Sequence, residues 1–333
     1  MNDLFAFIAK DKQLYLPVDT NGGAQFLPWT EGTELSEALN TARSPKDFFF
    51  PQTENLMAFK REGKKIELID VRREKEDIVV FGVRACDVKA FEVLDNVFLK
   101  EPVDTYYQNR RAHGIIMTLC CTKPAETCFC GTFGINPAEP HGDVACYLDE
   151  DALLMKPLTE KGEQFLGTLD AMTEACGEDA ADAQKALIRE RMAKLPLADL
   201  KSDAFGGDKT AAYFDSPAWK ELSEACLGCG TCTFVCPTCQ CYDIRDFDTG
   251  HGTTRYRCWD SCMYSEFTKM SAGQPRLTQL ERFRQRFMHK LVYYPANNDG
   301  LFSCVGCGRC VAKCPIHMNI VKVMKTLAKG EKQ

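Results

Sequence analysis

The chain has 333 residues, of which 45% are hydrophobic and 26% are charged, which is enough for two domains with separate cores. Its formal net charge of −6 argues against the basic face that nucleic-acid binding requires. Nineteen cysteines would suggest disulfides in a small secreted protein, but the start MNDLFAFIAK lacks a signal peptide's apolar run and no apolar stretch is long enough to span a membrane. We therefore expect a cytoplasmic protein without a membrane span, whose clustered cysteines bind metal.

Residues 1–150 are predicted to form an α/β or α+β domain. The segment IELIDV alternates between apolar and polar residues, and DIVVFGV and GIIMTLC are continuous apolar runs, as in strands that are buried on both faces. After VRACD, apolar residues recur at helical spacing from Val88 to Phe98, and Asp87 is placed to cap this helix.

Four cysteines of this domain are predicted to meet at one edge of the sheet. They are Cys86, Cys121, Cys128 and Cys130. Two follow the continuous apolar runs and two lie in the adjoining loop, so parallel neighbouring strands would bring all four together. The positive end of the helix that opens at Asp87 would favour an anionic iron–sulfur cluster there. The alternative is that Cys86 and Cys121 are packed core cysteines. We treat Cys120 as a spare thiol, and Cys146 and Cys176 as structural or incidental.

The rest of the chain divides into a connector and a cysteine-rich domain. Residues 151–215 are polar with a helical pattern and are predicted to form a helical connector. Within residues 216–333, helix-like stretches such as PAWKELSEAC and IVKVMKTLA flank two cysteine runs that begin 78 residues apart (304 minus 226). This distance is too long for a compact bacterial ferredoxin. We expect an all-α, ferredoxin-like dicluster domain with a cysteine-containing insert.

The two runs, CLGCGTCTFVCP and CVGCGRCVAKCP, share the spacing C-x2-C-x2-C-x3-C-P. In bacterial ferredoxins three cysteines of such a run bind one 4Fe-4S cluster and the fourth binds the other cluster. The glycines between the cysteines allow tight loops around a cluster. The predicted ligands are Cys226, Cys229, Cys232 and Cys314 for one cluster and Cys304, Cys307, Cys310 and Cys236 for the other. Paired CxxC units also bind zinc, but two complete copies favour iron–sulfur.

Four further cysteines near the first run are candidates for an extra site. They are Cys239, Cys241, Cys258 and Cys262. They could hold a fourth cluster or a zinc ion, or bind no metal, and the sequence does not choose between these readings.

The segment ERFRQRFMHK is predicted to be a helix with Phe283 and Phe287 facing inward. Its arginines Arg282, Arg284 and Arg286 then spread around the helix, most simply in solvent or in salt bridges. The sharper hypothesis is that they stabilise reduced clusters or dock an acidic partner. No GxGxxG follows a strand and no GxxxxGK[ST] occurs, so the chain is predicted to conduct electrons without its own flavin, nicotinamide or ATP site.

Several motifs together resemble a known family. SPKDFFFP, FGVRACD, CxxxxxxCFC, CLGCGTCTFVCPTCQCYD, WDSC, ERFRQRFMHK and CVGCGRCVAKCP are similar to the iron–sulfur subunit shared by cytosolic sulfhydrogenases, where it is the beta subunit, and anaerobic sulfite reductases. The resemblance spans nearly the whole chain except residues 151–215. It supports the three sets of four cysteines and also covers Cys239, Cys241 and Cys262, whereas Cys258 and Cys120 depart from the family pattern.

The resemblance implies an electron-transfer subunit of a cytoplasmic hetero-oligomer in anaerobic metabolism. Such a subunit relays electrons between a flavin subunit that oxidises NAD(P)H and a separate catalytic subunit, which is a hydrogenase, a sulfite reductase or part of a bifurcating assembly. Ferredoxin is a further candidate partner. We therefore expect a non-catalytic subunit with two 4Fe-4S clusters and a third in the first domain. Two alternatives stay open, an iron–sulfur reductase with a substrate site at the extra cysteines and a zinc-stabilised scaffold.

Overall fold

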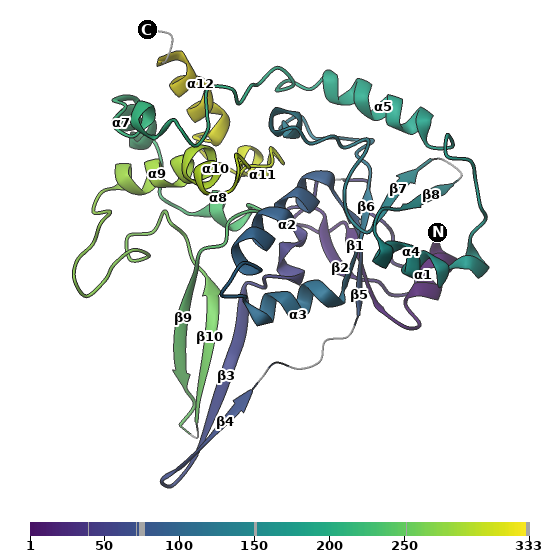
Figure 1. The fold of residues 1–333 in the computed structure, drawn as a ribbon, viewed down its shortest axis with the longest axis horizontal. Helices are drawn as coiled ribbons and strands as arrows, with labels where there is room; N and C mark the ends of the chain where they lie inside the picture. The colour runs from purple at the N-terminus through teal and green to yellow at the C-terminus, as the bar shows by residue number, and fades with distance from the viewer. Residues whose placement is uncertain (39, 71, 73–76, 150–151, 251, 331–333) are drawn as a thin grey trace.

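The computed structural model describes residues 1–38, 40–70, 72, 77–149, 152–250 and 252–330. A six-stranded sheet forms the N-terminal region, with the strand order β2-β1-β5-β6-β7-β8 (Figure 1). The strands are β1 (Gln13–Val18), β2 (Gln25–Pro28), β5 (Ile78–Val83), β6 (Gly114–Leu119), β7 (Val144–Leu148) and β8 (Leu153–Pro157). The four central strands are parallel, and the two edge strands are antiparallel to their neighbours. The expected parallel pairing of the two continuous apolar runs, β5 and β6, is confirmed.

Helices cover both faces of this sheet, which confirms the N-terminal α/β prediction. On one face α1 (Asn2–Ile8) and α4 (Glu160–Gly167) pack against the apolar residues of β1, β5 and β6. On the other face α2 (Ala85–Phe98) and α3 (Thr105–His113) pack against the alternate residues of β5 and β6. The continuous apolar runs are therefore explained by burial on both sides.

A second sheet is built from segments far apart in the sequence. Its order is β4-β3-β10-β9, and all its strands are antiparallel. The strands are β3 (Thr53–Glu62), β4 (Lys65–Asp70), β9 (Tyr242–Asp248) and β10 (Gly252–Trp259). This sheet extends away from the rest of the molecule (Figure 1). The prediction of an all-α C-terminal domain is therefore wrong for the insert, because alternating aromatic, aliphatic and charged residues there form a hairpin that pairs with β3.

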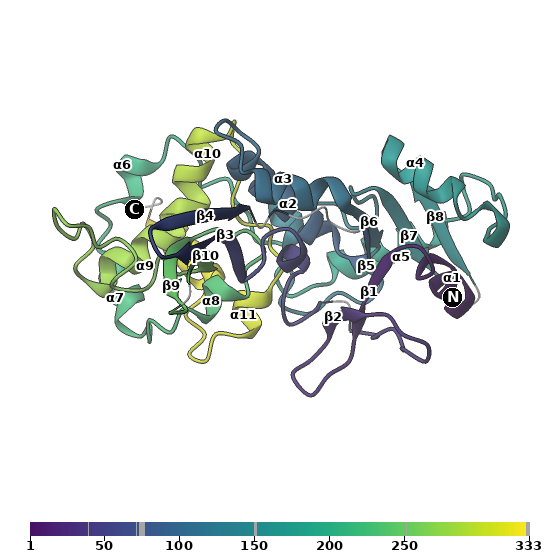
Figure 2. The same cartoon turned by 90° about the horizontal axis from the view of Figure 1, so that it is seen from below.

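Short helices surround the two cysteine runs at the end of the molecule opposite the six-stranded sheet (Figure 2). They are α7 (Ala218–Glu224), α8 (Thr231–Phe234), α9 (Gln279–Met288), α10 (Tyr294–Asn297), α11 (Arg309–Ala312) and α12 (Ile320–Gly330), with a π-helical segment, η4 (His289–Tyr293), after α9. Apolar residues of α7, α9, η4 and α12 share one core, in which Trp219, Phe283 and Phe287 are buried. The inward position of the two phenylalanines agrees with the sequence prediction.

The segment between the two regions is only partly helical. It contains α5 (Asp182–Ala193), α6 (Thr210–Tyr213) and 3-10 helix η3 (Asp170–Met172) besides α4, but residues 153–157 form β8 instead of a helix. The expected domain boundary at residues 150 and 151 lies outside the described residues. Two further 3-10 helices are η1 (Pro45–Phe48) and η2 (Cys130–Phe133). Among the described helices, none combines the length and the hydrophobicity needed to cross a membrane.

Candidate iron–sulfur sites

The four cysteines of the N-terminal set line one cavity at the carboxyl end of β5 and β6. Cys86 lies in the first turn of α2, directly after β5, and Cys121 follows β6. Cys128, in the loop before η2, and Cys130, the first residue of η2, complete the set. The structure thus brings together the four thiols that the sequence predicts at this edge. We call this cavity the N-terminal site.

Burial keeps these thiols protonated in the absence of a bound cation. It raises the pKa of Cys128 to about 11 and that of Cys130 to about 12, and it raises the pKa of Cys86 well above the ordinary value. Metal ligands must be thiolates, so binding a cluster here would release protons. The thiolates must therefore be stabilised against the cost of burial by the positive charge of the bound iron and of nearby cations. One such cation is Arg84, which is itself buried.

Asp87 does not cap α2, which corrects the sequence prediction. The helix begins at Ala85 and its N-cap residue is Arg84. The Asp87 carboxylate lies inside the first turn, almost fully buried, and accepts hydrogen bonds of 2.5 and 2.8 Å from both terminal nitrogens of Arg309. Arg309 belongs to the second cysteine run and begins α11. This ion pair therefore ties the N-terminal site to the C-terminal cysteine loop.

The second cysteine run and Cys236 line a second cavity, the middle site. Its thiols are Cys236, Cys304, Cys307 and Cys310. The fourth cysteine of the first run thus joins the first three of the second run, the crossing that the ferredoxin spacing predicts. Two buried cations, Arg286 and Lys290, line the same cavity.

The first three thiols of the first run, together with Cys314, form a third set, the outer site. Cys226 is close enough to Cys229 and Cys314 for their charges to influence its pKa, and Cys232 is close to Cys226. Cys229 is exposed, whereas the other thiols of the three sets are buried or half-buried. The outer site is therefore the one most open to solvent.

The N-terminal and middle sites share a wall. Gly306 and Cys307 line both cavities. The Phe129 amide donates to the Gly306 carbonyl at 2.8 Å, and Asn40 Nδ2 donates to the Cys307 carbonyl at 2.7 Å. A Cβ atom at Gly306 would lie 2.4 Å from the Phe129 carbonyl oxygen, so the two loops can approach this closely only because residue 306 is glycine.

Arg286 links the middle and outer sites. Its side chain is 2% exposed, it neighbours the thiols of Cys232 and Cys310, and its Nη2 donates to the Cys232 carbonyl at 3.3 Å. The N–H groups on its Nε and Nη1 have no hydrogen-bond partner. Unpaired buried donors are rare, and they fit a site that holds an anionic acceptor such as the sulfides of a cluster. The expectation that the arginines of this helix lie in solvent or in salt bridges is wrong for Arg286, because α9 turns its side chain toward the thiols, as the alternative hypothesis requires.

The extra cysteines do not form one set. Cys239 is in hydrogen-bonding contact with Cys236, and Cys241 is in hydrogen-bonding contact with Cys262. Cys258 lies apart on β10, where its charged neighbours are Arg245, Asp243 and Asp260. Among the residues with described positions, no group of three or more Cys, His, Asp or Glu side chains is arranged around a single metal ion.

Two lysines near the thiols were missed by sequence reasoning. Lys46, from the motif SPKDFFFP, is 2% exposed, donates to the Cys239 carbonyl at 2.8 Å and lies 3.7 Å from the centroid of the Trp259 ring. Lys290 donates to Thr238 Oγ1 at 2.8 Å. Burial lowers the pKa of Lys290, but the thiols of Cys236, Cys239 and Cys304 raise it overall. For Lys46, the sequence signal that could have revealed its burial was the position of a lysine within the phenylalanine-rich motif SPKDFFFP.

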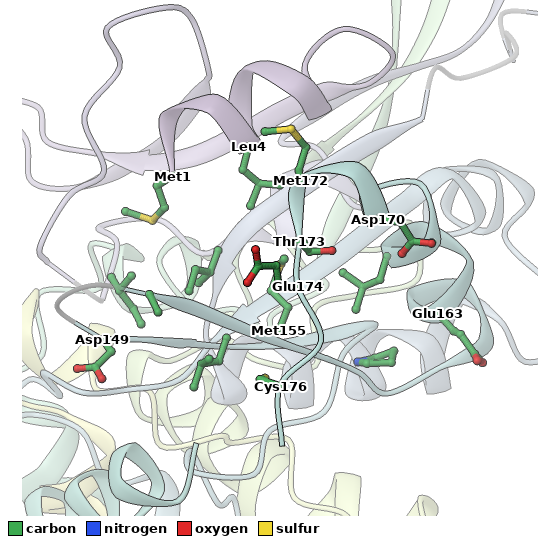
Figure 3. A pocket seen from close by; sticks show the side chains of 17 residues that line it. Met1, Leu4, Asp149, Met155, Glu163, Asp170, Met172, Thr173, Glu174 and Cys176 are labelled. Carbon is green, nitrogen blue, oxygen red and sulfur yellow. The ribbon is translucent and has the colours of Figure 1, made fainter. Parts of the chain in front are cut away.

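The remaining thiols lie elsewhere, and one of them lines a further pocket. Cys120, directly after β6, and Cys146, within β7, are buried, and Cys176 is exposed. Cys176 lines a pocket of about 700 Å³ near β8, together with Met1, Asp149 and Met155 (Figure 3). None of the twelve thiols of the three sites lines this pocket.

Comparison with known proteins defines the class of this chain. Residues 225–318 match the family model of the 4Fe-4S dicluster domain. The chain is also 32% identical over 322 residues to sulfhydrogenase 2 subunit beta of Pyrococcus furiosus, and the match covers 96% of this chain and 93% of the relative. No solved structure matches.

The chain belongs to the family of iron–sulfur subunits that includes the sulfhydrogenase beta subunit. It is an iron–sulfur electron-transfer subunit of an oxidoreductase, and it binds 4Fe-4S clusters.

Proposed function

We propose that this chain relays single electrons through three 4Fe-4S clusters, held at the N-terminal, middle and outer sites in that order. The observation that supports this order is the shared boundary at each step, with Gly306 and Cys307 between the first two sites and Arg286 between the last two. Such clusters exchange one electron at a time at potentials that hydrogen bonds and burial tune.

The residues around the sites favour the bound, negatively charged state of a cluster. Arg286 and Lys290 bring two buried positive charges to the middle site. Arg309 lies at its boundary with the N-terminal site, where its charge is paired with the Asp87 carboxylate. These cations offset the burial of thiolates, which by itself favours the neutral thiol. The N–H groups on Nε and Nη1 of Arg286 have no protein acceptor and are free to bond to cluster sulfide.

In this proposal the chain is a non-catalytic subunit between two partners. One partner is a flavin subunit that oxidises NAD(P)H, and the other is a separate catalytic subunit such as a hydrogenase or a sulfite reductase. The similarity to a subunit of a sulfhydrogenase supports a place in an assembly of this kind. The outer site supports it too, because the exposed Cys229 gives an electron a short path to a docked partner.

The test is to purify the chain without oxygen and measure its iron, acid-labile sulfide and zinc. Three clusters predict about twelve iron and twelve sulfide per chain. The Cys310→Ala variant should lose about four of each and interrupt electron flow between the N-terminal and outer sites, whereas Cys258→Ala should keep the full amount. A chain without iron and sulfide, or one that contains zinc in their place, would refute the proposal.

A further inference from the structure

The thiols of Cys241 and Cys262 meet at the base of the β9–β10 hairpin. The strand register pairs Tyr242, the first residue of β9, with Trp259, the last residue of β10. The amide of Asp260 then donates to the Cys241 carbonyl at 2.9 Å. These bonds hold the two chain segments together just outside the strands, and the Cys241 and Cys262 thiols lie close enough for each to shift the pKa of the other.

This pair differs from the thiols of the cluster sites. At the N-terminal and middle sites four thiols surround a cavity. Cys241 and Cys262 instead contact each other directly, and neither lines those cavities. Cys258, which could have completed a metal site, lies along β10 away from them. Two thiols in direct contact are suited to form a disulfide rather than to enclose a cluster.

The pair lies next to the proposed relay. Cys239 is two residues before Cys241 and is in hydrogen-bonding contact with Cys236, which lines the middle site. The ammonium groups of Lys46 and Lys290 lie on the buried side of this segment. Cys241 and Cys262 are themselves half-buried, and Tyr242 beside them is 38% exposed. Cys262 also neighbours Cys232 of the outer site, so the pair borders the middle and outer sites on one side and solvent on the other.

We propose that Cys241 and Cys262 form a redox-active dithiol that reduces small organic disulfides with electrons from the middle site. This activity goes beyond the relay and rests on it for its electrons. The Cys241 thiolate attacks one sulfur of the substrate RSSR, which forms a mixed disulfide and releases RS⁻. The Cys262 thiolate then attacks the Cys241 sulfur, which forms the Cys241–Cys262 disulfide and releases the second RS⁻. Two electrons, delivered one at a time, and two protons from solvent restore both thiols.

The test uses the full chain, purified without oxygen with its clusters and reduced with dithionite that is then removed. Hydroxyethyl disulfide is added, and reoxidation of the clusters is followed by visible absorption. The wild-type clusters should be reoxidised, and Cys241→Ser should slow this at least about tenfold, because the attacking thiolate is absent. The matched control, Cys258→Ser, removes a thiol of the same hairpin and should keep the wild-type rate. Cys262→Ser should trap mercaptoethanol on Cys241, which peptide mass spectrometry detects.

Two results would overturn this inference. One is a wild-type rate of reoxidation in Cys241→Ser. The other is a loss of iron and visible absorption in that variant, which would make Cys241 a metal ligand. The relay is tested separately by the iron content of the wild-type chain and by its transfer of electrons to methyl viologen. If both are normal while hydroxyethyl disulfide is not reduced, the dithiol inference fails and the relay stands.

Discussion

Arg286 is a cation enclosed between the middle and outer sites. Its side chain neighbours Cys232 and Cys310, and two of its nitrogens have no protein acceptor. A positive charge near a cluster favours the reduced state, because reduction adds a negative charge. Arg286 therefore affects the reduction potentials of the clusters, whereas the thiols bind the iron, and variants can test the two effects separately.

Replacing Arg286 with Gln should lower the reduction potentials of the middle and outer clusters. Removal of the charge makes each reduction less favourable, and a tenfold change in a one-electron equilibrium corresponds to about 59 mV. Redox titration monitored by electron paramagnetic resonance measures the shift. The control is Arg284→Gln on the same helix, since Arg284 donates to the Phe214 carbonyl and stacks on the Phe214 ring away from the thiols. Unchanged potentials in the Arg286 variant would contradict a tuning role.

The Asp87–Arg309 ion pair is expected to contribute to the stability of the fold. Both side chains are almost fully buried, so Arg309→Ala leaves an unpaired carboxylate and should cost about 3–5 kcal/mol of the free energy of unfolding. Urea unfolding followed by circular dichroism under nitrogen measures it. Arg255→Ala, which breaks a pair exposed to solvent, should leave stability nearly unchanged. The apolar double variant Asp87→Leu with Arg309→Met should recover most of the loss, and equal losses in single and double variants would contradict the reasoning.

At the scale of the elements, the contact between the loop of Gly306 and Gly308 and the loop of Thr127 and Phe129 restricts the residue type most strongly. Gly306 and Gly308 have φ angles of +58° and +77°, and added Cβ atoms would lie 2.4 Å from the Phe129 carbonyl oxygen and 2.5 Å from that of Thr127. Both the backbone conformation and the space require glycine there. The close approach keeps the N-terminal and middle sites adjacent, so it determines the distance that an electron must cross.

Gly306→Ala should therefore disturb two sites at once. The new methyl group pushes the loop that carries Cys307 away from the loop that carries Cys128 and Cys130, and we expect iron loss from both the N-terminal and the middle sites. Iron analysis and electron paramagnetic resonance of the purified chain measure this loss. Gly131→Ala is the matched control, because its Cβ would meet open space in the same region. Full iron content in the Gly306 variant would show that the loops separate without loss of clusters.

Features that depend on local sequence patterns could be predicted, whereas features that depend on contacts between residues remote in sequence could not. The thiol spacing and the continuous apolar runs are local signals, so the parallel pairing of β5 and β6 and the three groups of thiols could be expected from the sequence. The β9–β10 hairpin was missed because charged residues fill half of its alternating pattern and its partner β3 is remote in sequence. Likewise, arginines spaced around α9 do not indicate which one is buried, since tertiary packing alone selects Arg286.

At the scale of the whole molecule, exposure differs along the proposed relay. Cys229 at the outer site is exposed, and its hydrogen bond with the Thr231 hydroxyl lowers its pKa, which favours the reactive thiolate. The middle site is enclosed by the C-terminal core, and two of its thiols, Cys236 and Cys307, are buried. An oxidant from solvent thus reaches the outer site first.

Exposure to air should destroy the outer cluster before the middle one. Timed labelling with iodoacetamide after brief exposure, read by peptide mass spectrometry, should modify Cys226, Cys229 and Cys232 before Cys304 and Cys307. Cys176, an exposed thiol outside the sites, should be labelled at once even without air and serves as the internal control. Earlier labelling of the Cys304 group would contradict the order of exposure.

The second sheet also has a consequence for how the chain is made. β3 ends 190 residues before its partner β10 begins (252 minus 62), so at about 5–20 residues per second a ribosome needs roughly 10–40 s to supply that partner. Meanwhile β3 has β4 beside it, and a lone two-stranded hairpin is marginally stable in water. Ile66 and Leu68 remain exposed on β4 even in the finished fold. During much of its synthesis the nascent polypeptide therefore exposes the β3–β4 hairpin, with one edge of β3 unpaired and apolar side chains in contact with water. Its yield in cells should depend on chaperones that cover this hairpin.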